Sequence, residues 1–185
     1  LWSRMARHVA LTLIAAMLSF LAAPTWAALP VQGYVIKATY PHDTRAYTEG
    51  LLFLNGMLIE STGMEGQSNI RRVRLKDGAV LQSTPIAPSL FGEGVVNRGD
   101  ELISLTWRDQ VGFRWDLKTL TLKSSFSYPG EGWALTQNGR YLIMSDGTPF
   151  LRFLDPRTFK EIRRLRVTAE GRPVIYLNEL EWVKG

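Results

Sequence analysis

The fold of this chain is indicated by a short stretch, Phe91-Gly92-Glu93-Gly94, because related stretches recur before and after it. The earlier copy is Tyr47-Thr48-Glu49-Gly50, a later one is Glu131-Gly132-Trp133, and a degenerate fourth is Leu177-Asn178-Glu179-Leu180. The acidic residues of the four copies are about 40–50 residues apart, a period typical of repeated four-stranded units. We therefore interpret the chain as a β-propeller in which each copy opens the innermost strand of one unit.

Each copy is followed by an apolar run that ends at a turn signal. The first run, 50–54, meets Asn55-Gly56, which is the strongest short-range signal for a hairpin. Further along, Val73 alternates with Arg72 and Arg74, as expected for a half-buried strand. The pattern predicts strands at 34–39, 50–54, 57–61, 69–75, 79–85, 94–97, 101–107, 112–117, 121–128, 133–136, 140–145, 150–154, 160–167 and from 177 onward.

Four strands per unit are typical of propellers, and no helical period appears after residue 28. The sequence holds about three and a quarter such units, whereas a propeller needs at least about four blades to close. We therefore expect an all-β propeller domain at 29–185 that is incomplete at its C-terminus, with three blades and the start of a fourth. An open or oligomer-completed assembly is the alternative.

The composition fits one globular domain and argues against several kinds of chemistry. Of the 185 residues, 45% are hydrophobic and 21% charged, and there is no cysteine, so disulfide and thiolate chemistry are excluded. His42 is the only histidine beyond the first 28 residues, which argues against a zinc site. The same 157 residues carry 20 basic and 17 acidic side chains. We interpret the arginines near 71–74 and 163–166 as solvated strand faces and expect no nucleic-acid partner.

The N-terminus has the pattern of a secretory signal peptide at 1–28. Arg4 and Arg7 precede an uncharged apolar run, and Ala27 or Ala28 ends it with a small residue. The run is too short for a convincing membrane span, although an uncleaved anchor is the alternative. We therefore predict a periplasmic or secreted protein that has no membrane contact after cleavage.

The recurring acidic residues are the first candidates for chemistry. If the innermost strands approach one axis, Glu49, Glu93, Glu131 and Glu179 converge at its mouth, and glycines beside them permit close packing. Crowded carboxylates repel one another, so at least one pKa should rise toward a value suited to proton transfer. Two alternatives remain, a site for a hard cation such as Ca²⁺ and a plain repeat with solvated glutamates.

Aromatic residues accompany these carboxylates. Trp133 directly follows an acidic motif, and Trp107 ends a predicted strand, so we interpret both as walls of a pocket. For Trp115 and Trp182 packing in the core is an equally good interpretation.

Further short motifs are spread over about residues 34–185. The full set is Tyr47-Thr48-Glu49-Gly50-Leu51, Glu60-Ser61-Thr62-Gly63, Gly66-Gln67-Ser68, Phe91-Gly92-Glu93-Gly94, Leu105-Thr106-Trp107, Gly132-Trp133-Ala134-Leu135-Thr136, Ser145-Asp146-Gly147, Asp155-Pro156 and Leu177-Asn178-Glu179-Leu180-Glu181. Taken together, these motifs resemble the glutaminyl cyclases of the plant and bacterial type. That family is a five-bladed β-propeller that converts N-terminal glutamine of peptides to pyroglutamate and releases ammonia. The resemblance implies that neither a metal nor an organic cofactor is needed.

The resemblance also implies roles for particular residues. The family's catalytic glutamate, a proton shuttle, falls on Glu93, and its substrate-binding asparagine falls on Asn178, which we group with Glu93 as catalytic. The substrate-binding residues fall on Tyr47, Glu49, Phe91, Trp107 and Trp133. Plant members have Phe and Gln where this chain has Tyr47 and Glu49. A further tryptophan and a lysine of the family site would lie beyond Gly185.

The sequence therefore predicts a glutaminyl-peptide cyclotransferase that acts on peptides or proteins with N-terminal glutamine and is a monomer when full length. Two other functions remain open. One is a propeller that binds peptides at its central mouth without catalysis, and the other is a cation-dependent propeller hydrolase. A pyroglutamate assay separates the first from the prediction, and sensitivity to chelators separates the second.

Overall fold

The structure is a computed structural model that describes residues 31–183, so the predicted signal peptide at 1–28 lies outside the described residues. The chain divides into two compact units, 1–36 and 37–185, and the second holds every strand described below. Residues 31–47 contain no strand, which corrects the strand predicted at 34–39. Tyr34 is 90% exposed, and an extended segment with no partner beside it has nothing to stabilise it as a strand.

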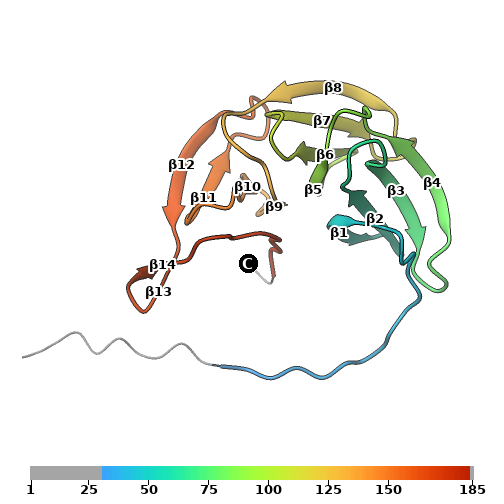
Figure 1. The fold of residues 1–185 in the computed structure, drawn as a ribbon, viewed down its shortest axis with the longest axis horizontal. Coiled ribbons are helices and arrows are strands. Elements are labelled where there is room, and N and C mark those ends of the chain that lie inside the picture. Colours follow the sequence, from blue (N-terminus) through green and yellow to red (C-terminus); the bar gives the residue numbers. More distant parts are fainter. Residues whose placement is uncertain (1–30, 184–185) are drawn as a thin grey trace, which may run out of the picture. The chain divides into compact units, whose positions relative to one another are not determined.

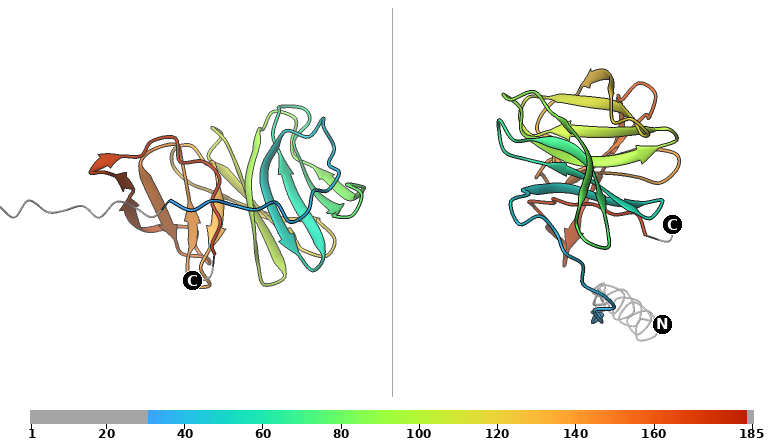
Figure 2. Two further views of the ribbon diagram at one scale, coloured as in Figure 1. Left: turned by 90° about the horizontal axis from the view of Figure 1, so that it is seen from below. Right: turned by 90° about the vertical axis from the view of Figure 1, so that its right-hand side faces the viewer.

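Three four-stranded antiparallel sheets make up the second unit, and in each the strands follow one another in sequence order. The first strand of each sheet lies on the inner side and the fourth on the outer side (Figure 1), and the views in Figure 2 keep the three sheets distinct. The first sheet consists of β1 (Thr48–Leu54), β2 (Met57–Thr62), β3 (Asn69–Arg74) and β4 (Val80–Pro85). The second consists of β5 (Gly92–Arg98), β6 (Glu101–Thr106), β7 (Val111–Asp116) and β8 (Leu122–Ser127). The third consists of β9 (Leu135–Gln137), β10 (Leu142–Met144), β11 (Phe150–Leu154) and β12 (Glu161–Arg166).

This arrangement confirms the all-β propeller architecture predicted from the motif spacing. The turn at Asn55-Gly56 shows why the first hairpin forms where it does. Both residues have positive φ, 51° and 80°, and Leu54 pairs with Met57 directly across the turn. Asn and Gly tolerate this left-handed conformation, which matches the twist of the strands on either side.

Glycine lets the inner strands pack backbone to backbone. A Cβ on Gly50 would lie 2.7 Å from the Val95 amide nitrogen, and one on Gly94 would lie 2.6 Å from that of Leu135. The Gly94 amide also donates a hydrogen bond to the Trp133 carbonyl oxygen at 2.7 Å. The close approach expected at positions 50 and 94 is therefore confirmed. Gly132 differs, because its missing side chain makes room for the Tyr128 hydroxyl instead.

Two apolar clusters fill the spaces between sheets. Neighbouring residues of β5 point to opposite faces, so Val95 packs in one cluster and Val96 in the other. The first cluster joins sheets one and two through Ile59, Ile70, Ile86, Val95, Leu102, Phe113, Trp115 and Leu120. The second joins sheets two and three through Val96, Ile103, Leu105, Tyr128, Leu135, Leu142, Met144, Leu154 and Phe159.

The two tryptophans left open by the sequence have different environments. Trp115 is 2% exposed, and its indole Nε1 donates to Ser104 Oγ at 2.9 Å, so it is a core residue. Trp182 is 47% exposed and lines a hollow beside Phe53 and Leu180, outside the two core clusters.

Beyond the third sheet the chain forms a short hairpin, β13 (Thr168–Ala169) and β14 (Arg172–Pro173). Residues 174–183 carry the fourth copy of the motif but form no strand, which corrects the inner strand predicted from 177 onward. The physical reason is that a strand needs a ladder partner, and this segment instead docks on loop 145–147 through isolated hydrogen bonds. Within residues 31–183 we find no helix that is long and apolar enough to cross a membrane.

Candidate active site

The residues predicted for the site line one cleft of about 230 Å³. They are Tyr47, Glu49, Phe91, Glu93, Trp107, Trp133 and Asn178. Five of them lie in or just before the innermost strands β1, β5 and β9, Trp107 follows the second strand β6, and Asn178 comes from the segment after β14. The inner strands meet through their glycines, so side chains at the starts of β1 and β5 converge on one point. The structure therefore brings the predicted residues together, while their roles remain predictions.

The carboxyl group of Glu93 is the most perturbed group in the cleft. Glu93 is 5% exposed and lies in β5. Burial, followed by repulsion from the carboxylates of Glu49, Glu179 and Glu131, raises its pKa to about 9. A group with this pKa is protonated at neutral pH and can both donate and recover a proton.

Glu49 lines the same cleft as Glu93. The interaction between the two carboxyl groups further raises the pKa of Glu93 and opposes the rise in the pKa of Glu49. Burial is the larger effect on Glu49, so its pKa is also raised. The two side chains are thus an acid pair whose protonation is coupled.

Glu131 has the opposite character. Its Oε2 accepts hydrogen bonds from Trp107 Nε1 at 2.7 Å and Trp133 Nε1 at 2.8 Å. The hydrogen bond from Trp133, followed by the one from Trp107, lowers the pKa of Glu131. This glutamate therefore stays anionic and organises the aromatic walls, a function that the spacing of the motif alone did not predict.

The aromatic walls form a connected series around the cleft. Tyr47 meets Phe91 edge to face with ring centroids 5.9 Å apart, and Phe91 meets Trp107 at 5.5 Å. The guanidinium of Arg108 lies 3.6 Å above the Trp107 ring, a cation–π contact on the outer side. Together with Trp133, these rings make a slot that suits the flat amide of a small side chain.

Asn178 is held in the cleft through its backbone. The buried Ser145 hydroxyl donates to the Asn178 carbonyl oxygen at 2.8 Å and accepts from the Ala134 amide at 2.9 Å. Two residues earlier, the Tyr176 amide donates to the Gly147 carbonyl oxygen at 2.8 Å. Ser145 thus positions Asn178 in the absence of a strand. The sequence signal for it is the Ser145-Asp146-Gly147 motif, which by itself does not reveal this contact.

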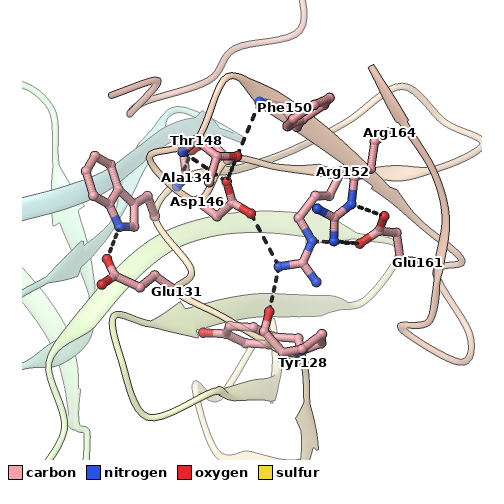
Figure 3. Close-up of polar contacts among 12 residues, drawn as sticks. Tyr128, Glu131, Ala134, Asp146, Thr148, Phe150, Arg152, Glu161 and Arg164 are labelled. Atoms are coloured by element: carbon pink, nitrogen blue, oxygen red, sulfur yellow. Dashed lines mark hydrogen bonds and ion pairs between the residues drawn. The ribbon is translucent and has the colours of Figure 1, made fainter. Parts of the chain in front are cut away.

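Behind the cleft, Arg152 ties the third sheet to the loop before β9 (Figure 3). Its side chain is 1% exposed, donates from Nε to Glu161 at 2.9 Å and from Nη1 to the Pro129 carbonyl oxygen at 2.8 Å, and lies 3.7 Å from Asp146. These contacts fix the loops that carry Glu131 and Gly147. The strand sequence at 150–154 does not reveal that its single arginine points inward.

The fourth acidic position, Glu179, lies beside Glu49 and Asn178 in an adjoining hollow of about 130 Å³. Partial burial of its carboxyl group, followed by repulsion from Glu181, raises its pKa to about 7. Among residues 31–183, no group of three or more His, Asp or Glu side chains is arranged to hold a metal ion.

A larger cleft of about 490 Å³ lies between the first two sheets, away from these groups. Two of its charged side chains are engaged in structural contacts: Arg72 donates to Gln82 and to the Lys118 carbonyl oxygen, and Asp116 accepts from the amides of Lys118 and Thr119. The smaller cleft around Glu93 is therefore the candidate active site.

The fold and this site define a propeller-type protein whose inner cleft places the buried carboxyl of Glu93 and the half-buried carboxyl of Glu49 between aromatic walls. A sequence profile described as glutamine cyclotransferase matches residues 9–185, so the chain belongs to that family. The predicted family is thereby confirmed.

Two relatives show the extent of the similarity. A glutaminyl-peptide cyclotransferase of Arabidopsis thaliana is 39% identical over 150 residues, which are 80% of this chain and 47% of the relative. The crystal structure of a Myxococcus xanthus glutaminyl cyclase matches with a TM-score of 0.73 and 34% identity, over 79% of this chain and 62% of that one. This chain thus spans about half the length of the curated relative.

Proposed function

We propose that this protein is a glutaminyl-peptide cyclotransferase that converts N-terminal glutamine of peptides or proteins to pyroglutamate and releases ammonia. The observation that carries the proposal is the buried, protonated carboxyl of Glu93 in a cleft with aromatic walls. Membership of the glutamine cyclotransferase family and the names of both relatives support it.

The reaction suits a single proton-shuttling group. The substrate's α-amine attacks the carbon of its own γ-amide, the new C–N bond closes a five-membered ring, and the C–N bond to the amide nitrogen breaks. The attacking nitrogen must lose one proton and the leaving nitrogen must gain one, so a single carboxyl that gives and takes a proton completes the cycle without net change. A peptide α-amine has a pKa of about 7.7–8.0, and the pKa of Glu93 is about 9. Because the two values are close, proton transfer between these groups involves only a small change in free energy.

The remaining residues position the substrate. Because the reaction is intramolecular, most of its acceleration comes from holding the glutamine side chain folded against its own amine. Asn178 offers an amide that can hydrogen-bond the substrate amide, and Trp107 and Trp133 flank the slot and limit access of water to the reacting carbon. Tyr47 and Phe91 complete the apolar side on which the side chain packs.

We further propose that the activity needs no metal ion and that the protein acts in the periplasm or outside the cell. The first proposal is supported by the donor set, because His42 is paired with Glu60 and lies outside the cleft lining, and the chain has no cysteine. The second rests on the charge and hydropathy pattern of residues 1–28.

The direct test is to incubate the complete gene product with a peptide that begins with glutamine and to follow ammonia release and pyroglutamate formation. We expect turnover that persists in strong chelators. A matched peptide that begins with asparagine is the control, since its shorter side chain cannot close the same ring. Binding of the peptide without turnover would instead favour a peptide-binding propeller, and activity that a metal ion restores after chelation would favour a cation-dependent enzyme.

A further inference from the structure

Glu131 belongs to the repeated acidic motif but does something different from Glu49 and Glu93. A single oxygen, Oε2, accepts from both Trp107 Nε1 and Trp133 Nε1, at 2.7 and 2.8 Å. Trp107 follows β6 of the second sheet, and Trp133 precedes β9 of the third. One carboxylate therefore connects two walls of the cleft that come from different sheets.

Arg108 contacts both Trp107 and Glu131. We call the arrangement of Glu131, Trp107, Trp133 and Arg108 the clamp. The Arg108 guanidinium stacks over the Trp107 ring at 3.6 Å, and its Nε lies 3.4 Å from Glu131 Oε1. Each oxygen of the carboxylate thus has a partner, and the Trp107 ring is held both at its edge and on its face.

The loop that carries Glu131 is itself anchored. The Gly132 amide donates to the Trp107 carbonyl oxygen at 2.9 Å, and the Trp133 amide donates to the Ser145 carbonyl oxygen at 3.0 Å. The Pro129 carbonyl oxygen accepts from the buried Arg152 (Figure 3). On the far side of Trp133, a Cβ on Gly147 would lie 2.6 Å from the indole, so the ring has no room to swing that way.

We propose that Glu131 is a positioning residue that sets the width of the slot between Trp107 and Trp133 and so keeps the glutamine side chain folded for ring closure. The inference rests on the proposed function. It identifies the hydrogen-bond acceptor, rather than the negative charge, as the feature that matters. The rings then lie where the substrate needs them before it arrives, and ordering them costs nothing at the moment of binding.

The test compares Glu131→Ala with Glu131→Gln in the complete gene product. Glu131→Ala removes the acceptor, and we expect kcat for a glutamine-initiated peptide to fall by about 10²-fold, because a small misplacement of positioning groups costs that much. Glu131→Gln keeps an oxygen that both indoles can reach, so it recovers most of the lost activity. Glu65→Ala, in an exposed loop, is the matched control.

A second readout follows the rings themselves. Iodide should quench the tryptophan fluorescence of Glu131→Ala more than that of the wild type or Glu131→Gln, with circular dichroism confirming that all variants are folded. Should Glu131→Ala fail to fold, the double variant Trp107→Phe, Trp133→Phe keeps an aromatic ring at each position and removes both N–H donors. We expect it to lose activity in the same way. If Glu131→Gln is as impaired as Glu131→Ala, or if the folded Glu131→Ala or the double variant works like the wild type, the clamp is not what positions the substrate.

The outcome is separable from that of the proposed function. A wild-type protein that forms no pyroglutamate would refute the enzyme assignment, whereas the quenching comparison would still report whether Glu131 orders the two indoles.

Discussion

Two buried glutamates in neighbouring sheets show what burial does and does not imply. Glu60 in β2 is fully buried, but Arg71 Nε donates to it at 2.6 Å, His42 Nε2 lies 3.0 Å away, and the Thr48 hydroxyl donates to it as well. Glu93 in β5 is 5% exposed, and its charged neighbours are carboxylates. Glu60 is held by an ion pair with Arg71 and a hydrogen bond from Thr48, and it stabilises the fold. The second retains its proton and is available for chemistry.

The comparison teaches that the partners of a buried carboxyl, and not its burial, identify a reactive group. The two sites are connected through consecutive residues of β1, since Thr48 contacts Glu60 while Glu49 contacts Glu93. Residues on opposite faces of one strand therefore serve a structural site and a candidate catalytic one. If the distinction is real, substitutions in the two sites should separate activity from stability.

The largest expected effect is on turnover. Glu93→Gln keeps the size of the side chain but removes the group that carries the proton, so kcat in the complete gene product should fall by about 10²–10⁴-fold while KM changes much less. Ammonia release from a glutamine-initiated peptide measures the change, and circular dichroism confirms folding. Glu65→Gln, in the exposed loop at 63–67, is the matched control and should behave like the wild type. A folded Glu93→Gln protein that keeps more than about half of its activity would transfer the shuttle to Glu49.

The next largest effect is a loss of stability and concerns Glu60. Arg71→Ala leaves the Glu60 carboxylate buried without its main partner, which should lower the free energy of unfolding by about 3–5 kcal/mol. Urea denaturation of the wild type and the variant gives the difference. Arg74→Ala is a suitable comparison, because Arg74 and its partner Asp77 are both about half exposed, so solvent screens their ion pair and its loss should destabilise the protein far less. Equal losses in the two variants would mean that the buried pair has no special role.

The sequence predicted the residues that line the cleft better than the contacts that hold them in place. The glycine-flanked copies at Glu49 and Glu93 specify inner strand starts, and the backbone contacts at Gly50 and Gly94 bring both to one cleft as expected. Glu131 shares the motif, but its carboxylate is captured by an indole that lies 24 residues earlier in the chain, and such a long-range partner is not visible in a local pattern.

The remaining misses have the same origin. Residues 34–39 and 177–183 have the composition of strands, yet a strand forms only beside a partner, and neither segment has a ladder in the structure. The Glu60 site is likewise assembled from His42, Thr48 and Arg71, on three different segments, which the motif Glu60-Ser61-Thr62-Gly63 does not foretell.

The third prediction concerns pH. The pKa of Glu93 is raised from 4.5 to about 9, so between these values the native protein keeps a proton that the unfolded chain has lost. The free energy of unfolding should therefore fall as pH rises through this window, and this contribution is absent in Glu93→Gln. Urea denaturation at about pH 5 and about pH 9 gives the slopes, and the difference between the two proteins isolates Glu93 from other titrating groups. Parallel pH curves for the wild type and Glu93→Gln would show that Glu93 does not titrate in this range.

The smallest effect is expected at His42, the member of the Glu60 site nearest to solvent. Its side chain is 35% exposed, and Arg71 and Thr48 still contact Glu60 when the imidazole is removed. His42→Ala should therefore cost no more than about 1 kcal/mol of stability, as for an exposed ion pair, and should leave kcat and KM for a glutamine-initiated peptide unchanged. The kinetic result is the sharper one, because a mechanism that drew a histidine base from residues 29–185 would depend on His42. A large loss of turnover in a folded His42→Ala protein would place the chemistry on the Glu60 side of β1 and reverse the assignment of the two buried glutamates.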